Sequence, residues 1–316
     1  VQHDKVFAAF EKAVSLDPLS QRALGNYINA LMVRDRLIQA DLALEKLATI
    51  DPVKHATMQG YRKSAGGKWA YQALGYLDHK LLDPQARDNK AVFRTTLAVL
   101  GLDEEAIAVF DSPRIFTLLI LGRPLEAVAL AQARLDENPD SQGARETLAE
   151  VQARAGIYAP ARPFWERWWQ EDPQSFGYSD LAVMVAMRRD ADDQDDANEF
   201  TSIMKQKARE FYAAGMPRGG RTYFEAGLAA YLQGDREKGI ELIRQAVEAG
   251  QFIQLNVDYL QPIYEDPDFP PILEMQLERQ KRERARLLSV VCDDNPYEAV
   301  WQPQAGTCEE FMSLPK

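Results

Sequence analysis

The sequence predicts an all-α protein built from repeated helix–turn–helix units, on three observations. Good helix formers such as Leu, Ala, Glu, Arg and Gln are abundant in a chain of 316 residues that is 46% hydrophobic and 27% charged. One stretch, residues 221–250, has the apolar pattern of two short helices joined by a tight turn. Small or turn-forming residues also recur along most of the chain at alternating intervals of seven and five.

Residues 221–250 show the proposed unit most clearly. Apolar residues spaced by four and three share one helix face, and they are Phe224, Leu228 and Tyr231 in the first helix and Ile240, Ile243 and Val247 in the second. Gly234 in the Gln-Gly-Asp turn is expected to end the first helix. The small residues between the two faces let the helix backbones approach closely.

The same spacing places a series of turns along the chain. The predicted turn positions are Val1, Asp35, Gly67, Gly101, Gly122, Gly156, Asp190 and Gly234, which are separated by steps of 34, 32, 34, 21, 34, 34 and 44 residues. The short step predicts a shortened repeat and a bend near residues 111–114. The long step predicts an acidic insertion at residues 190–217, with a helix from about residue 197 to residue 214.

A helix–turn–helix period of 34 residues ending in Asp-Pro or Asn-Pro resembles the tetratricopeptide repeat family, over residues 1–250. The resemblance implies an α-solenoid. Beyond it we expect capping helices at residues 251–291, which cover the last apolar surface, and an irregular tail at residues 292–316.

The resemblance also implies a non-catalytic role in binding a protein or peptide. In such repeats the first helices line the inner, concave face, where ligands usually lie. Transferred to this chain, the inner-face positions are Arg22, Asn29, Gln59, Lys63, Glu146, Glu150, Arg221, Phe224 and Tyr231.

The two cysteines, Cys292 and Cys308, both lie in the turn-rich tail. A disulfide between them would stabilise the fold by roughly 3 kcal/mol on the chain-entropy model, and it would indicate an oxidising compartment. The alternative is two free thiols in a cytosolic protein. A zinc site is not expected, because two sulfurs without a neighbouring His make an incomplete set of ligands.

We expect no catalytic site, metal or cofactor. The three histidines lie near no evident nucleophile, and no Gly-x-Ser-x-Gly motif is present. The acidic run at residues 190–196 lacks the Gly and the closing Glu of a calcium loop, so we interpret it as a solvated loop that caps the following helix. Residues 60–68 resemble a phosphate loop only faintly, because the glycine spacing fails.

Charge and hydropathy restrict the partners. A net charge of −11 argues against nucleic acid or an anionic membrane surface as the main partner. The sequence has no run of 18 apolar residues that could span a bilayer. A repeat cut open at Val1 would expose an apolar face, so self-association is an option.

The opening Phe-Glu-Lys-Ala-Val-Ser-Leu-Asp-Pro, the repeats and the Asp-Pro-Asp-Phe-Pro-Pro-Ile-Leu segment resemble the C-terminal region of bacterial membrane-bound transcriptional regulators and adenylate cyclases. This resemblance implies a periplasmic sensory region of a membrane-anchored signalling protein, which could carry a cyclase domain elsewhere. The alternative is a freestanding cytoplasmic scaffold or chaperone adaptor with reduced cysteines.

Overall fold

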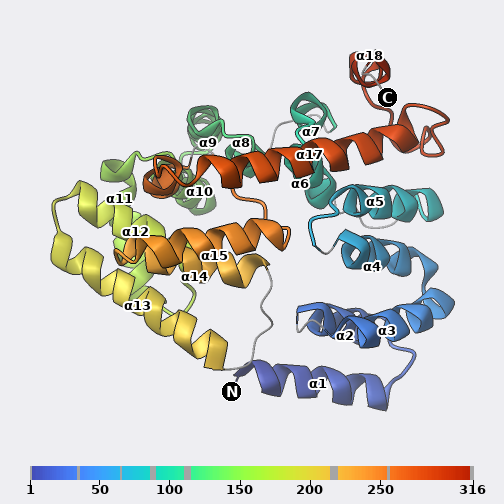
Figure 1. Ribbon diagram of the computed structural model, residues 1–316, viewed down its shortest axis with the longest axis horizontal. Helices are drawn as coiled ribbons and strands as arrows, with labels where there is room; N and C mark the ends of the chain where they lie inside the picture. Colours follow the sequence, from blue (N-terminus) through green and yellow to red (C-terminus); the bar gives the residue numbers. More distant parts are fainter. Residues whose placement is uncertain are drawn as a thin grey trace. The chain divides into compact units, whose positions relative to one another are not determined.

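The computed structural model describes residues 2–33, 36–64, 66–85, 90–109, 115–213, 220–254 and 257–313, and within them every regular element is a helix (Figure 1). The prediction of an all-α, tetratricopeptide-type fold class is confirmed, because consecutive helices pack as helix–turn–helix pairs. The predicted turns at Val1 and Asp35, and the predicted bend at residues 111–114, lie outside the described residues.

The chain divides into two compact units. Unit 1 contains Val1–Val109, Phe211–Gly219 and Glu278–Lys316, and unit 2 contains Phe110–Glu210 and Gly220–Leu277. Each unit is described by itself below.

Unit 1 starts with α1 (Gln2–Leu16) and continues with three helix pairs. The pairs are α2 (Gln21–Val33) with α3 (Leu37–Ile50), α4 (Pro52–Ser64) with α5 (Ala70–Leu82), and α6 (Lys90–Val99) with α7 (Asp103–Ala108). It also contains residues 278–291 of α17 (Pro270–Val291) and the final α18 (Ala305–Ser313).

Unit 2 contains four helix pairs. They are α8 (Ile115–Ile120) with α9 (Pro124–Glu137), α10 (Gln142–Arg154) with α11 (Tyr158–Glu171), α12 (Tyr178–Asp190) with α13 (Gln194–Ala213), and α14 (Gly220–Leu232) with α15 (Arg236–Glu248). Residues 211–213 at the end of α13 belong to unit 1. A 3-10 helix, η1 (Asp258–Leu260), the short α16 (Gln261–Tyr264) and residues 270–277 of α17 follow.

Six turns inside the pairs share one hydrogen bond, in which a backbone N–H returns to the carbonyl five residues earlier, whereas in the α4–α5 turn the Lys68 N–H donates to the Ser64 carbonyl four residues earlier. The shared bond joins Arg36 to Leu31, Leu102 to Leu97, Arg123 to Leu118, Ile157 to Gln152, Asp193 to Arg188 and Asp235 to Ala230. In five of these turns, those ending at residues 102, 123, 157, 193 and 235, the bond closes a helix end in which one residue adopts the left-handed conformation. Glycine takes that position at Gly101, Gly122, Gly156 and Gly234, with φ between 68° and 87°.

The pair α12–α13 departs from the predicted turn position. Asp190 is the last residue of α12, and Asp192 adopts the left-handed conformation with φ 57°. Asp is one of the few residues other than Gly that tolerate this region. The turn-to-turn steps around it are therefore 36 and 42 residues, from Gly156 to Asp192 and from Asp192 to Gly234.

Two helix pairs are held by backbone-to-backbone contact at glycines. A Cβ built on Gly75 of α5 would lie 2.6 Å from the Cα of Gly60 in α4, and these helices pack side by side (Figure 1). In α14 and α15 a Cβ on Gly239 would lie 2.8 Å from the Cα of Tyr231. Gly60 therefore serves helix packing, as the helical interpretation of residues 60–68 predicts.

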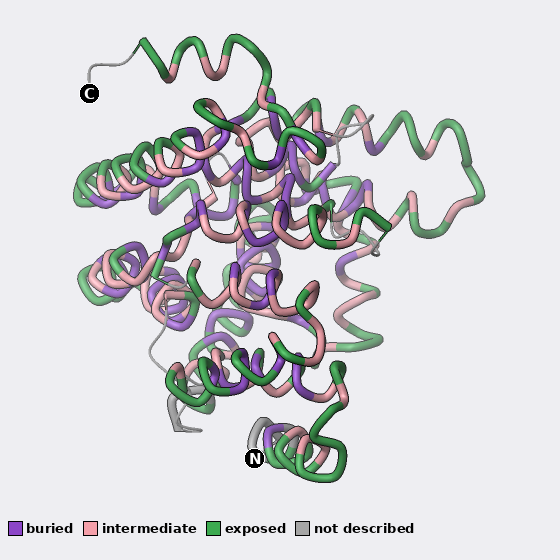
Figure 2. The backbone as a smooth tube through the Cα atoms, turned by 90° about the vertical axis from the view of Figure 1, so that its right-hand side faces the viewer, coloured by how far each residue is buried: buried purple, intermediate pink, exposed green. Residues whose placement is uncertain are grey.

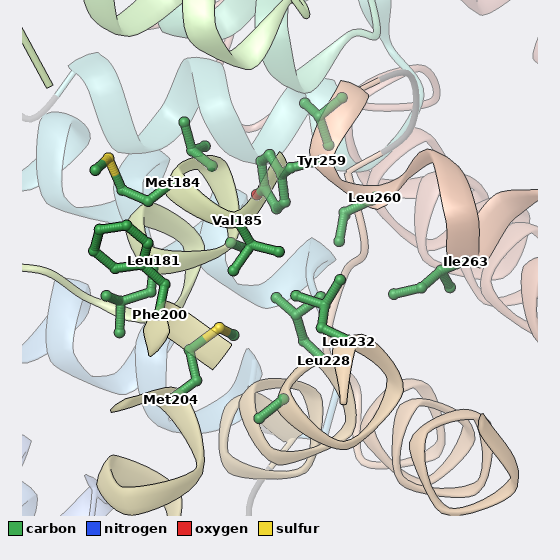
Figure 3. Close-up of a cluster of buried hydrophobic side chains, with 14 of the residues drawn as sticks. Leu181, Met184, Val185, Phe200, Met204, Leu228, Leu232, Tyr259, Leu260 and Ile263 are labelled. Atoms are coloured by element: carbon green, nitrogen blue, oxygen red, sulfur yellow. The ribbon is translucent and has the colours of Figure 1, made fainter. Parts of the chain in front are cut away.

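Burial follows the helical period, and Figure 2 shows buried and exposed stretches alternating along the helices. The largest cluster of buried side chains lies in unit 2, where Leu181 and Met184 of α12 pack near Phe200 and Met204 of α13 (Figure 3). Trp165 is fully buried in the same cluster, and its indole Nε1 donates a hydrogen bond of 3.2 Å to the carbonyl oxygen of Ala149.

The C-terminal part of unit 1 is fixed to α5 through α7 by polar and aromatic contacts. The buried Glu283 carboxylate accepts a hydrogen bond from the N–H of Ala70, the first residue of α5. Tyr297 donates to Asp78 at 2.7 Å, and the Trp301 ring meets the Phe93 ring edge-on at a centroid distance of 5.3 Å.

The tail is partly helical rather than irregular throughout. The buried Glu105 carboxylate accepts hydrogen bonds of 2.7 Å from the N–H of Gln304 and the hydroxyl of Thr307, so it stabilises the start of α18. The Sγ atoms of Cys292 and Cys308 lie at bonding distance, 2.01 Å. None of the described helices is both long and apolar enough to cross a membrane.

We expect Gly75→Ala to lower the free energy of unfolding by roughly 1–3 kcal/mol, because the new methyl group meets rigid backbone in α4. Gly143→Ala in α10 is the matched control. No atom lies within 4 Å of its new Cβ, so we expect no loss, or a gain of up to about 1 kcal/mol from helix propensity. Urea denaturation measures both, and equal effects would contradict the close-packing argument.

Candidate functional site

Four of the predicted inner-face residues lie on neighbouring first helices of unit 1. Arg22 and Asn29 of α2 and Lys63 of α4 are exposed, whereas Gln59 of α4 is half-buried. Lys54 of α4 connects the two helices, because its ammonium donates to the carbonyl oxygen of Gln21 at 2.9 Å. The structure therefore places these residues on two helices joined by the Lys54 contact, and the Lys63 ammonium lies 5.9 Å from the centre of the Tyr71 ring in α5.

The two predicted residues on α10 of unit 2 have local partners. Glu150 accepts from Arg154 at 3.1 Å, and Arg154 also lies 3.4 Å from Asp180 of α12. This ion pair links two neighbouring first helices. Glu146 is half-buried and accepts a hydrogen bond of 2.7 Å from Gln142.

The three predicted residues on α14 differ in their surroundings. The Arg221 side chain is 84% exposed and pairs with Glu225 at 2.7 Å. Phe224 is half-buried against the main cluster of unit 2. The Tyr231 hydroxyl lies 2.7 Å from the carbonyl oxygen of Pro262 and 3.0 Å from Asp266.

The first helices of unit 2 form a row that its own chain partly covers. Helices α8, α10, α12 and α14 contact one another in that order, and η1 packs on α12. Tyr259, Leu260 and Ile263 are buried beside Val185 and Leu232 (Figure 3). The residues from η1 to α16 therefore occupy part of the surface on which the repeat pattern predicts a ligand.

A network around Asp266 fixes this covering segment. Arg236 binds the Asp266 carboxylate through two nitrogens, both at 2.7 Å, and Tyr231 shares the same carboxylate. Burial alone would raise the pKa of Asp266, but hydrogen bonds from the Asp268 N–H, Arg236 and Tyr231 lower it below its usual value. Burial and the bond to Asp266 raise the pKa of Tyr231 to about 12.

A groove of about 690 Å3 lies elsewhere in unit 2, between the second helices α9 and α11 and over the first helix α10. Its lining residues are Gln132, Leu135, Gln142, Arg145, Glu146, Leu148, Ala149, Gln152, Pro160, Pro163, Phe164 and Arg167. Glu146 is the one predicted site residue among them. Apolar side chains and three glutamine amides are thus combined in a single groove, which suits a ligand with both apolar and hydrogen-bonding groups.

Two exposed arginines give the groove its cationic groups. Arg145 donates to the carbonyl oxygens of Pro139 and Asp140 at 2.6 and 3.2 Å. Arg167 lies 5.8 Å from the centre of the Phe164 ring, and its nearest carboxylate, Glu171, is 3.9 Å away. The Arg167 side chain is 57% exposed, so its guanidinium remains accessible to a ligand.

Comparisons with solved structures give weak likenesses, one of which is described here. No family model and no curated protein sequence matches the chain. A tetratricopeptide repeat protein from Parabacteroides merdae, known from a crystal structure, is 11% identical, with 87% of this chain and 92% of that chain covered and a TM-score of 0.31. The helix pairs and turns described above give the chain an all-α fold of the tetratricopeptide type.

Sequence reasoning missed the groove residues on α11. Phe164 and Arg167 lie on a second helix, and the repeat pattern assigns ligand contacts to first helices only. A signal was present, because Phe164 and Arg167 share a helix face beside that of Trp165 and Trp168. Trp168 and Trp169 pack against Phe176 at centroid distances of 4.6 and 5.2 Å, which leaves Phe164 and Arg167 to line the groove.

The acidic run behaves as a helix cap with a cationic partner. Asp193 accepts a hydrogen bond of 3.2 Å from the N–H of Asp196 at the start of α13. Arg188 lies 3.2 Å from Glu166, 3.6 Å from Asp193 and 3.4 Å from Asp196, so it balances part of the negative charge. Among the described residues no group of His, Cys, Asp and Glu side chains is arranged to hold a metal ion.

We expect the Tyr231→Phe substitution to lower the free energy of unfolding below pH 10 and to have a smaller effect at alkaline pH. The folded-state pKa of Tyr231 is raised from 10.0 to about 12, so its contribution is complete below pH 10 and disappears as the pH rises through 12. Above that range a phenolate would face the Asp266 carboxylate. Chemical denaturation at pH 9 and pH 12 measures the free energy of unfolding of the original protein and of Tyr231→Phe. The difference between the two proteins should be smaller at pH 12 than at pH 9, and an equal difference at both pH values would contradict the assigned pKa.

Proposed function

We propose that this chain is a non-catalytic binding protein that holds a segment of a partner protein in the groove on α9, α10 and α11. The single observation that supports this site is the groove's size and lining. About 690 Å3 falls within the range of ligand sites, and its apolar residues and amides offer both burial and hydrogen bonds.

A peptide fits this lining better than a compact small molecule. The groove is open and is lined by residues along the length of α10, from Gln142 to Gln152. Glutamine amides can pair with the N–H and carbonyl groups of a peptide backbone, while Phe164 and Leu135 offer apolar contact area.

Unit 1 offers a second proposed surface. Arg22, Asn29, Gln59 and Lys63 lie on neighbouring first helices, and Lys54 adds another cation there. The proposed contacts of Glu150, Arg221, Phe224 and Tyr231 in unit 2 would have to coexist with their present partners. We therefore place the principal contact in the groove.

We further propose that the repeats, residues 1–250 with residues 251–291 as their cap, form the sensory region of a bacterial membrane-anchored signalling protein in the periplasm. The cysteine pair in the tail supports an oxidising compartment. A freestanding cytoplasmic scaffold or chaperone adaptor is the alternative, and it requires free thiols.

We expect Phe164→Ala to weaken peptide binding by about tenfold or more, because it removes an aromatic contact from the groove. Peptides are first selected from a phage-displayed random library on the immobilised full chain, and their affinities are then measured by fluorescence anisotropy with synthetic copies. Gln152→Trp, which fills one end of the groove, provides a second disruptive variant.

Phe116→Ala is the matched control for this experiment. Phe116 is 46% exposed on α8 of the same unit and does not line the groove. Its removal should change the affinity by less than about twofold. Selected peptides that bind Phe164→Ala and Gln152→Trp as tightly as the original protein would refute the groove as the binding site.

We expect no free thiols in protein produced in the periplasm, and two after reduction, because the Cα atoms of Cys292 and Cys308 lie 5.3 Å apart. The measurement is thiol titration in denaturant without reductant. Protein produced in a reducing cytosol is the control. Two free thiols in the periplasmic product would remove the support for the periplasmic assignment and favour the cytoplasmic alternative.

A further inference from the structure

One hydrogen bond fixes how α10 and α11 face each other across the groove. Trp165 of α11 donates to the carbonyl oxygen of Ala149 in α10, so these two positions are opposite. The helices are joined by a tight turn and run antiparallel. Residues that precede Ala149 therefore lie at the same end as residues that follow Trp165, which puts Arg145 and Arg167 at the end away from the turn and Gln152 and Pro160 at the end near it.

The two arginines of the groove consequently lie at the same end of it. Glu146 is the single acidic residue in the lining, and its carboxylate already accepts from Gln142. The lining at that end has two guanidinium groups and one carboxylate, and Glu171, which does not line the groove, lies 3.9 Å from Arg167, in a chain with a net charge of −11. This local excess of positive charge favours an anionic group on the ligand.

The remainder of the groove is largely apolar. Ala149, Phe164, Pro160 and Pro163 line it toward the turn between α10 and α11, and Gln152 adds one amide. A charged side chain placed there would lose hydration without gaining an ionic partner from the lining. The two ends of the groove therefore favour different side chains.

The length of the groove sets the size of the segment. Ten helical steps separate Gln142 from Gln152, or about 15 Å along the α10 axis. An extended peptide advances about 3.3 Å per residue, so about five residues cover this length.

We propose that the ligand is an extended peptide segment of about five residues with a defined polarity. Its Asp or Glu side chain binds between Arg145 and Arg167, and its apolar side chains lie over Ala149 and Phe164. This inference rests on the proposed function, since it specifies which partner segment the same groove accepts.

The experiment repeats the peptide selection on the original chain and on the double variant Arg145→Glu with Arg167→Glu. Arg134→Glu, on the exposed surface of α9 outside the groove, is the matched control. Peptides are synthesised with acetylated and amidated ends, so that only side-chain carboxylates are tested.

On the original chain we expect the selected peptides to carry Asp or Glu at one end of an apolar stretch. The double variant should weaken their binding by about tenfold or more and should select Lys or Arg at that position instead. Arg134→Glu should change the affinity by less than about twofold.

The outcomes separate this inference from the function on which it rests. Peptides that need Phe164 but show no preference for acidic residues would overturn the polarity and leave the groove as the binding site. The absence of any peptide that depends on Phe164 would overturn the proposed function itself, and this inference with it.

A salt titration of the original chain tests the polarity even if the double variant fails to fold. Affinity for a selected acidic peptide should fall between 50 and 500 mM NaCl, because salt screens exposed charges beyond a Debye length of about 10 Å at 0.1 M. A copy with Lys in place of Asp or Glu should bind about tenfold more weakly or worse at low salt. Equal binding of the two copies would overturn the inference.

Discussion

Direct contact between helix backbones within a pair is the constraint on which the other features depend. Gly60 meets Gly75 where α4 and α5 cross, and Gly239 meets the backbone of Tyr231 in the other tight pair. Such contacts leave no room for a side chain, so they fix the register of one helix against the next. Once the register is fixed, the positions of side chains on neighbouring helices follow from their numbers in the sequence. In a third pair, α10 and α11, a hydrogen bond from the Trp165 side chain to the Ala149 carbonyl joins the two helices.

Segments outside the repeats are held by carboxylates that accept hydrogen bonds from the repeats or from the tail, and two of the three, Asp266 and Glu105, are buried. Asp258 of η1 accepts from Tyr158, Asp266 accepts from Tyr231 and Arg236, and Glu105 accepts from Gln304 and Thr307. A carboxylate removed from water costs free energy unless its oxygens find donors. Each segment therefore has one arrangement that satisfies its carboxylate, and other arrangements would leave a buried charge without donors. The non-repeating parts gain a defined place on the repeats in this way.

The sequence predicted the features that depend on local pattern, such as the glycine turns. It did not predict the features that depend on contacts between residues far apart in the chain. Gly101, Gly122, Gly156 and Gly234 were expected at turns, and each adopts the left-handed conformation that glycine permits. Asp192 has the same role without a glycine, so the turn was placed two residues too early. The tail was expected to be irregular because prolines interrupt it, yet α18 starts where Glu105, about 200 residues earlier, accepts its first donors. The groove was missed for a similar reason, since three helices contribute to it.

The covering segment supports the proposal that a partner binds unit 2 in the groove rather than on the row of first helices. Tyr259, Leu260 and Ile263 are at most 5% exposed, so a ligand that displaced them would have to expose core residues to water. On α11, packing fixes Trp165, which is fully buried, whereas Arg167 is 57% exposed and not constrained by the core. Exposed side chains can be substituted without loss of the fold when buried contacts on the same helix hold its register. In the proposed site Arg167 can therefore contribute to the choice of partner without supporting the core, whereas Phe164 both lines the groove and packs against the buried cluster.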